Sequence, residues 1–110
     1  MNKYIVVLVT VPSEKEGEKL ARKLVARRLA ACVNIIRNIN SIFRWQGKVE
    51  RAKEVLLVIK TRKSLFARLE KLVSNLSSYE LPEVLALPVE NGKAGYLRWI
   101  KDATARISSD

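Results

Sequence analysis

The residues best suited to chemistry are the carboxylates of a short segment around a proline. Glu80 and Glu83 flank Pro82, and Tyr79 precedes them. Carboxylate oxygens bind hard divalent cations, but a calcium cage needs about six to eight oxygens, so Glu80 and Glu83 predict only a weak metal site. The alternative, which we prefer, is that they form interface salt bridges or lie in water. Tyr79 has the phenol and apolar ring typical of a cleft wall or an interface.

A second group of residues combines positive charge with an indole. Arg44, Trp45 and Lys60, together with Tyr79, could line a cleft that binds a small anion by stacking and charge pairing. The same residues could equally form a cation–π and salt-bridge cluster between subunits. Cys32 is a further candidate for a cleft where subunits meet. Because free cysteine is among the most buried residue types, we prefer to interpret Cys32 as a small buried hydrophobe.

Histidine is absent from the sequence, and this absence removes most enzyme chemistry. Without imidazole there is no Ser-His-Asp or Cys-His catalysis and no histidine-ligated metal. The single cysteine cannot form an internal disulfide, which favours a reducing compartment and points to the cytoplasm. We therefore expect a protein that is not an enzyme and that requires no cofactor.

The chain is strongly basic, with 21 Lys and Arg against 11 Asp and Glu and a net charge of +10. Such a charge attracts polyanions. Lys15, Lys19, Lys23 and Arg27 recur at helical spacing and form a basic row. Aromatic residues that could stack on bases lie elsewhere in the sequence, so we expect a solvated face and no specific nucleic-acid partner. The apolar run over 4–9 is far shorter than the ~20 residues of a membrane span, so we expect no membrane partner.

The hydrophobic pattern predicts the elements that must position these residues. An unbroken apolar run predicts the first strand, Ser13 and Glu16 form a capping-box signature, and a change of phase near Ile36 indicates a bulge. On the last helix, Tyr96 and Trp99 share an apolar face with Ile100, Ala103 and Ile107. The expected elements are strands over Lys3–Val9, Cys32–Trp45, Val49–Thr61 and Val84–Leu87, and helices beginning at Ser13, over roughly Arg62–Leu76, and over Ala94–Ile107.

This order of elements predicts one domain over residues 1–110 of the α+β class. The βαββαβ order, with a right-handed crossover in each half, is that of a ferredoxin-like sandwich in which the first and third strands are central. An additional helix follows at the C-terminus. The second and third strands, joined at 46–48, form an unusually long β-hairpin.

The far end of this hairpin predicts self-association. It carries the apolar residues Ile39, Ile42, Phe43 and Trp45, which two helices of about fifteen residues cannot cover. Soluble monomers rarely leave so large an apolar patch exposed, and unpaired strand edges add to the problem. The alternative is a hairpin that curls onto its own subunit, with Trp99 filling the gap. We prefer an interface between copies of the chain.

Six segments together give the sequence a family resemblance that covers nearly the whole chain. In this order and spacing it resembles the CutA divalent-cation tolerance proteins. The segments are Val9–Pro12, Leu29–Asn34, Ser41–Lys48, Glu54–Thr61, Tyr79–Glu83 and Tyr96–Ile100.

The resemblance implies a ferredoxin-like fold, a homotrimer built through the long hairpins, clefts between subunits, a cytoplasmic or organellar location and a link to tolerance of copper and other divalent metals. It implies no catalytic activity. The chain departs from the family pattern where relatives carry histidines, here Leu76 and Ser77, and where some carry a cysteine, here Val9. The resemblance therefore implies much weaker copper binding here than in histidine-bearing relatives.

Two further classes share this architecture and remain alternatives. A trimeric protein that senses a small anion or nucleotide would need a long loop between the middle strands and a glycine-rich phosphate loop. The link at 46–48 is too short for the first, and no glycine-rich segment supplies the second. An acylphosphatase-like enzyme would need an arginine in the loop after the first strand. That loop contains Glu14 and no arginine. Both alternatives rank below a binding protein.

Overall fold

The strands and helices follow the predicted order. The computed structural model describes residues 3–106, and within this range it has four strands and three α-helices. The elements are β1 (Tyr4–Val11), α1 (Glu14–Ala26), β2 (Cys32–Trp45), β3 (Lys48–Arg62), a 3-10 turn (Lys63–Leu65), α2 (Phe66–Leu76), β4 (Leu85–Pro88) and α3 (Ala94–Ala103). The predicted fold class and bulge are confirmed, and Ile107 lies outside the described residues.

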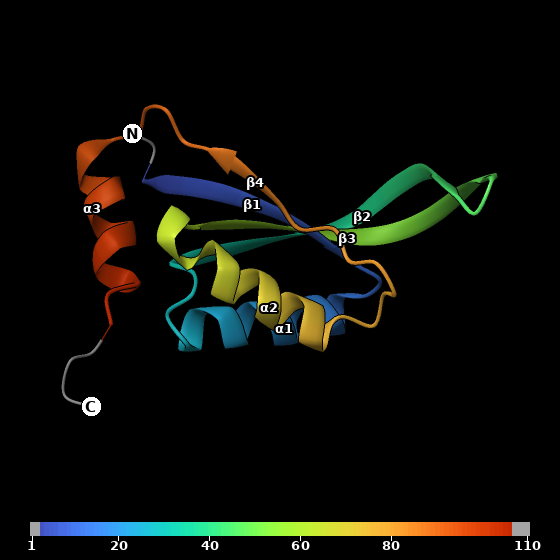
Figure 1. The fold of residues 1–110 in the computed structure, drawn as a ribbon, viewed down its shortest axis with the longest axis horizontal. Coiled ribbons are helices and arrows are strands. Elements are labelled where there is room, and N and C mark those ends of the chain that lie inside the picture. Colours follow the sequence, from blue (N-terminus) through green and yellow to red (C-terminus); the bar gives the residue numbers. More distant parts are fainter. Residues whose placement is uncertain (1–2, 107–110) are drawn as a thin grey trace.

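The four strands form one antiparallel sheet in the order β2-β3-β1-β4, so the first and third strands are central as predicted. Helices α1 and α2 lie along one side of the sheet, and α3 stands at one end of it (Figure 1). None of the helices in the range 3–106 is long and apolar enough to cross a membrane.

The N-terminus of α1 also fixes the segment that follows α2. Ser13 accepts a hydrogen bond from the Glu16 N–H at 3.2 Å, as an N-cap residue does. The predicted capping box is only half formed, because the Glu16 carboxylate does not return to Ser13. It accepts hydrogen bonds from the Ser78 hydroxyl at 2.7 Å and the Ser78 N–H at 3.1 Å. The start of α1 thereby holds the beginning of the 77–84 segment.

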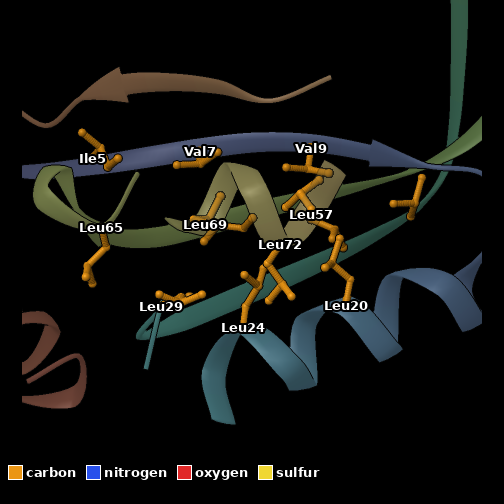
Figure 2. Close-up of a cluster of buried hydrophobic side chains, with 14 of the residues drawn as sticks. Ile5, Val7, Val9, Leu20, Leu24, Leu29, Leu57, Leu65, Leu69 and Leu72 are labelled. Atoms are coloured by element: carbon orange, nitrogen blue, oxygen red, sulfur yellow. The ribbon is translucent and has the colours of Figure 1, made fainter. Parts of the chain in front are cut away.

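The core lies between the sheet and the two helices (Figure 2). Every second residue of β1 points into it, and Val7 and Val9 are fully buried. Leu20 and Leu24 from α1, Leu57 from β3, and Leu69 and Leu72 from α2 meet these valines, as the close-up shows. Apolar side chains of both helices therefore pack against the sheet, whereas Val25, near the end of α1, is 44% exposed.

The opposite face of the sheet is apolar but uncovered by any helix within the described residues (Figure 1). Side chains of directly opposed residues lie on the same face, so the pairs Val6–Leu87, Leu8–Val58 and Leu8–Leu85 belong to this side. We call it the open face, formed by Val6, Leu8, Leu56, Val58, Leu85, Leu87 and Ile36. Leu85 is 57% exposed and the central members are half-buried.

The β2–β3 hairpin extends well beyond the helices (Figure 1). Its loop is the two-residue turn Gln46-Gly47, with φ of 50° and 83°, values typical of a tight hairpin turn. The predicted bulge lies between Ile36 and Ile39, where β2 contains one more residue than β3 and Asn38 has φ of 60°. The alternative of a hairpin curled onto its own subunit is therefore wrong.

The hairpin residues predicted for an interface differ in exposure. Ile42 is 72% exposed and Phe43 is 41% exposed, while Ile39 and Trp45 are half-buried. Ile39, Phe43 and Trp45 lie opposite Glu54, Glu50 and Lys48, which continue the phase of the open face. The apolar side of the hairpin is therefore continuous with the open face across the bulge.

Helix α3 departs from the expected inner face. Among the described members of the predicted set only Ile100 is buried, and Ala103 is half-buried. The rings of Tyr96 and Trp99 remain about half exposed, with their centroids 5.4 Å apart and their planes tilted by 40°. The reason is that α3 stands at the end of the sheet and does not lie along its face (Figure 1). Only one row of its side chains can therefore be buried against the sheet. Trp99 does not fill a gap beneath the hairpin.

Candidate functional site

A hollow of about 780 Å³ lies where the hairpin leaves the body of the sheet. Its walls come from β2 and β3 on the hairpin, from the end of β1 and from the segment after α2. We call it the hairpin-base cleft, defined by the aromatic residues Phe43, Trp45 and Tyr79 and the carboxylates Glu50, Glu54, Glu80 and Glu83. Arg51 is the only cation that lines it among the described residues.

Glu54 is the most buried carboxylate of the cleft, with 9% of its surface exposed. The Tyr79 hydroxyl donates a hydrogen bond to Glu54 Oε2 at 2.6 Å and joins the segment after α2 to β3. Burial, the hydrogen bond to Glu54 and the nearby carboxylates all raise the pKa of Tyr79, so the phenol stays protonated. Tyr79 therefore donates a hydrogen bond to Oε2 of Glu54 and none to Oε1.

Glu83 is the second carboxylate influenced by Glu54. Burial first, and then the negative charge of Glu54, raise the pKa of Glu83, and a hydrogen bond with Thr10 partly offsets the rise. Within residues 3–106, neither Glu54 nor Glu83 forms an ion pair with a lysine or arginine. The cleft therefore concentrates negative charge that the described side chains do not neutralise.

The structure brings together four of the seven residues expected to line a cleft. Trp45, Tyr79, Glu80 and Glu83 all line the hairpin-base cleft. Arg44 pairs with Val49 near the hairpin tip and does not line it. Within one subunit neither Arg44 nor Lys60 lines this cleft, where carboxylates dominate, and an anion-binding cleft between subunits stays a prediction.

Cys32 and Lys60 lie together at the opposite end of the hairpin. They are direct cross-strand partners, and Lys60 Nζ is 3.8 Å from the Cys32 sulfur and donates a hydrogen bond to Asn34 Oδ1. Cys32 is half-buried on the edge strand. The expectation that Cys32 is a buried core residue is wrong, because β2 is an edge strand and this residue lies on the open side.

The chemistry of the hairpin-base cleft is that of a cation-attracting site. Carboxylates that repel one another in a partly buried cleft gain free energy when a cation binds between them. No group of three or more Cys, Asp or Glu side chains in the described part of the chain converges tightly enough to hold a metal ion. One subunit thus offers part of a coordination shell rather than a complete one.

Sequence reasoning missed Glu54 and Glu50. Glu54 directly precedes the apolar run Val55–Ile59. A charged residue next to a buried strand segment is itself often partly buried and then needs a partner, and this pattern could have indicated its role. Its partner Tyr79 lies 25 residues away, so the hydrogen bond has no local signature. Glu50 lines the cleft because it lies opposite Phe43 in the hairpin. This pairing depends on the strand register beyond the bulge, which the sequence does not specify.

Comparisons with known proteins agree on a single family. Residues 5–103 match the model of the "CutA1 divalent ion tolerance protein" family. A relative from Arabidopsis thaliana named "Protein CutA, chloroplastic" is 49% identical over 91% of this chain and 55% of its own length. The chain spans about half the length of this relative and of the mouse and human proteins named CutA.

Two solved structures have the same fold over nearly their entire length. The divalent cation tolerance protein from Thermus thermophilus is 45% identical, with a TM-score of 0.91 over 93% of this chain and 99% of that one. The structure described as the periplasmic divalent cation tolerance protein CutA of Archaeoglobus fulgidus is 38% identical, with a TM-score of 0.90 over 93% and 99% of the two chains. The resemblance first visible in six short segments therefore extends to the whole fold.

Proposed function

The chain belongs to the CutA1 divalent ion tolerance family, and on this premise we propose that it is a non-catalytic homotrimer that binds divalent cations in the hairpin-base cleft. The family resemblance supports a trimer and a link to divalent metals. The site residues supply the chemistry of binding. The one cysteine and the absence of a disulfide support a cytoplasmic location.

The observation that carries the proposal is the uncompensated charge of Glu54. A buried carboxylate is costly unless a cation or several hydrogen bonds compensate it. Glu54 is 9% exposed, yet its single recorded hydrogen bond comes from Tyr79, and no described lysine or arginine pairs with it. A divalent cation shared with Glu83, or a cation from a neighbouring subunit, would remove this cost.

Assembly would complete both the cleft and the open face. The open face presents a row of leucine, isoleucine and valine side chains that continues onto the hairpin. No described residue of the same chain pairs with the outer edges of β2 and β4. Burial of such a face against other copies gains about 25 cal/mol for each Å² of apolar surface. The side chains predicted to form the interface, Ile39, Ile42, Phe43 and Trp45, lie on the hairpin that would reach the next subunit.

Copper would be a weak ligand of this chain. Strong copper(II) sites use imidazole nitrogen, and the sequence has no histidine. Glu54, Glu80 and Glu83 offer oxygen, which favours harder ions such as Mg²⁺, Ca²⁺ and Mn²⁺. We infer a dissociation constant for copper(II) no tighter than roughly 10 μM, equivalent to about −7 kcal/mol. No cofactor is required, and the bound cation would exchange freely.

Calorimetric titration of the full chain with Mn²⁺, Mg²⁺ and Cu²⁺ tests cation binding. Glu54→Gln preserves the hydrogen bond to Tyr79 but removes the charge, so it should weaken Mn²⁺ binding about tenfold or more. Glu70→Gln, an exposed position on α2, removes the same charge elsewhere and should leave the affinity unchanged. Equal affinity of all three proteins, or submicromolar stoichiometric copper(II) uptake, would contradict the proposed site.

Light scattering tests the assembly separately. The chain should elute as one species of about three chain masses, each of 12.5 kDa. A monodisperse monomer at micromolar concentration would overturn the trimer even if cations bind. If the unmodified trimer binds cations and the Glu54→Gln protein remains a trimer but does not bind them, the site lies at Glu54. The loss of binding then does not result from a loss of assembly.

A further inference from the structure

A second hollow lies at the opposite end of the molecule from the hairpin tip. It has a volume of about 310 Å³ and lies among the C-terminal end of α1, the start of α2 and the C-terminal end of α3. These three helix ends come together at the end of the body away from the hairpin (Figure 1). The hollow is distinct from the hairpin-base cleft, with which it shares no lining residue.

Five arginines line this hollow, which we call the arginine hollow. They are Arg27, Arg28, Arg62, Arg68 and Arg106. The other lining residues are small or apolar apart from Thr104, and none of those that the structure describes is Asp or Glu. The hairpin-base cleft is thus lined by carboxylates and the arginine hollow by guanidinium groups. The net charge of +10 is therefore concentrated in part at a single concave site.

Two of the five arginines have a structural role. Arg62 Nε donates to the Thr104 hydroxyl at 2.8 Å and its Nη2 donates to the Thr104 carbonyl at 3.0 Å. Arg28 Nη1 donates to the Ala103 carbonyl at 3.2 Å. Both guanidinium groups thereby satisfy carbonyls at the C-terminal end of α3, where positive charge is favourable. These contacts fix two guanidinium groups at the wall of the hollow.

The backbone of Arg28 adopts a left-handed conformation, which is energetically unfavourable for a residue other than glycine. Leu29 N–H bonds to the Leu24 carbonyl and Arg28 N–H bonds to the Val25 carbonyl, which together form a Schellman motif at the end of α1. Glycine is the usual residue at the left-handed position of this motif. Here the position is occupied by Arg28 with φ of 58°.

The remaining three arginines have no recorded partner in the described part of the chain. Arg27, Arg68 and Arg106 are exposed at the rim, and neither hydrogen bonds nor ion pairs from their side chains occur among residues 3–106. Guanidinium groups around one hollow repel each other, and a bound anion would turn this repulsion into attraction. Capping of α3 explains Arg28 and Arg62 but leaves these three unexplained.

We propose that the arginine hollow binds a small anion that carries two or more phosphate groups. The planar guanidinium fork donates two parallel hydrogen bonds to phosphate oxygens, which a lysine ammonium does not do. Five positive charges exceed what a single phosphate neutralises, and a hollow of this volume accommodates a compact ligand. Its concave shape at the meeting point of three helix ends favours such a ligand over the extended backbone of a nucleic acid.

Titration calorimetry with tripolyphosphate at about 0.15 M salt tests the proposal, because exposed charges are screened strongly at that ionic strength. The full chain should bind one tripolyphosphate per subunit with a submillimolar dissociation constant, and inorganic phosphate should bind at least tenfold more weakly. Arg27→Gln with Arg68→Gln should weaken tripolyphosphate binding at least tenfold. Lys15→Gln with Lys19→Gln removes the same net charge from the outer side of α1 and serves as the matched control.

A charge-retaining variant separates a built site from general attraction. Arg27→Lys with Arg68→Lys should lose at least threefold in affinity for tripolyphosphate, because lysine cannot donate the paired hydrogen bonds. Equal weakening by the lysine-row control, binding no tighter than millimolar, or unchanged binding after Arg27→Gln with Arg68→Gln would overturn the proposal. Duplex DNA binding that survives 0.15 M salt and depends on the same arginines would assign the hollow to nucleic acid instead.

Discussion

The two faces of the sheet have nearly the same composition and very different surroundings. On β1, Val7 and Val9 point to the helices and are fully buried, while Val6 and Leu8 point the other way and are half-buried. On β3, Leu57 is fully buried and the adjacent Leu56 is not. Residue type alone therefore does not distinguish a face covered by the same chain from a face that another copy would cover.

This difference separates two kinds of stabilisation. Burial of the helix-facing side accompanies folding of one chain and does not depend on protein concentration. Burial of the open face against other subunits would depend on concentration through mass action. A pair of neighbouring substitutions on one strand can therefore report on the two contributions independently.

The largest expected effect is that of Leu57→Ala. Leu57 is fully buried, so this substitution should lower the free energy of unfolding by about 2–5 kcal/mol at every protein concentration. Leu56→Ala removes the same atoms from the open face and should cost about 1 kcal/mol in dilute protein, with a larger loss in the assembled protein. Urea denaturation at two concentrations measures both. Equal and concentration-independent costs for the two variants would show that the faces do not differ.

The second effect concerns assembly and uses two residues of similar exposure. Phe43 on the hairpin is 41% exposed and Val25 on α1 is 44% exposed. Phe43→Asp should weaken subunit association by about a hundredfold, or about 3 kcal/mol, because it would place a carboxylate in the interface. Val25→Asp, on the solvent side of α1, should leave the assembled mass unchanged. Light scattering over a dilution series distinguishes them, and dissociation of both variants alike would count against a hairpin interface.

A smaller effect is expected at the hairpin-base cleft. Since burial and Glu54 raise the pKa of Glu83, ionised Glu83 opposes folding at neutral pH. Glu83→Gln should therefore stabilise the cation-free protein at pH 7, by no more than about 1 kcal/mol because the side chain is only half-buried. The gain should fade as pH falls through the raised pKa toward the ordinary glutamate value.

The control for this pH dependence is Glu80→Gln, which removes an exposed carboxylate of the same loop. Thermal unfolding at several pH values measures both variants in the presence of a chelator. A stability gain from Glu83→Gln that persists unchanged below the ordinary glutamate pKa would contradict electrostatic repulsion from Glu54 as its cause.

The smallest effect is expected on the outer surface of the helices that cover the sheet. The basic row on α1 should bind duplex DNA weakly, and this binding should decline steeply between about 50 and 200 mM salt because phosphate contacts alone support it. Retention on DNA during a salt gradient measures it. Sequence-selective binding at physiological salt would require a further surface on the protein beyond this row.

Much of the fold could be predicted because its signals are local. The apolar runs of β1 and β3, the leucine spacing of α2 and the phase change in β2 each determine an element within a few residues. The unbroken run of β1 predicts burial on both faces. It cannot reveal that one of those faces is covered by no element of its own chain within the described residues.

The site was only partly predictable because it depends on pairing at long range. Tyr79, Glu80 and Glu83 are close in sequence and remain together in the cleft. Cys32 and Trp45 belong to one strand, but at about 3.3 Å for each residue they lie roughly 40 Å apart along it. Cys32 and Lys60 therefore share a cross-strand pair at one end, while Trp45 lines the cleft at the other.

The bulge in β2 has a consequence for how the length of the hairpin can change. Ile36 and Ile39 both face the open side, so removal of one of the two residues between them would leave a regular ladder with Ile39 still opposite Glu54. Removal of one residue between Ile39 and Phe43 would instead turn Phe43 and Trp45 to the other side of the ribbon, because a strand directs every second side chain to the same face. A change of two residues there would preserve the orientation. The bulge residue can therefore be lost without turning the apolar side of the hairpin, whereas the stretch of β2 beyond the bulge can change length only in even steps.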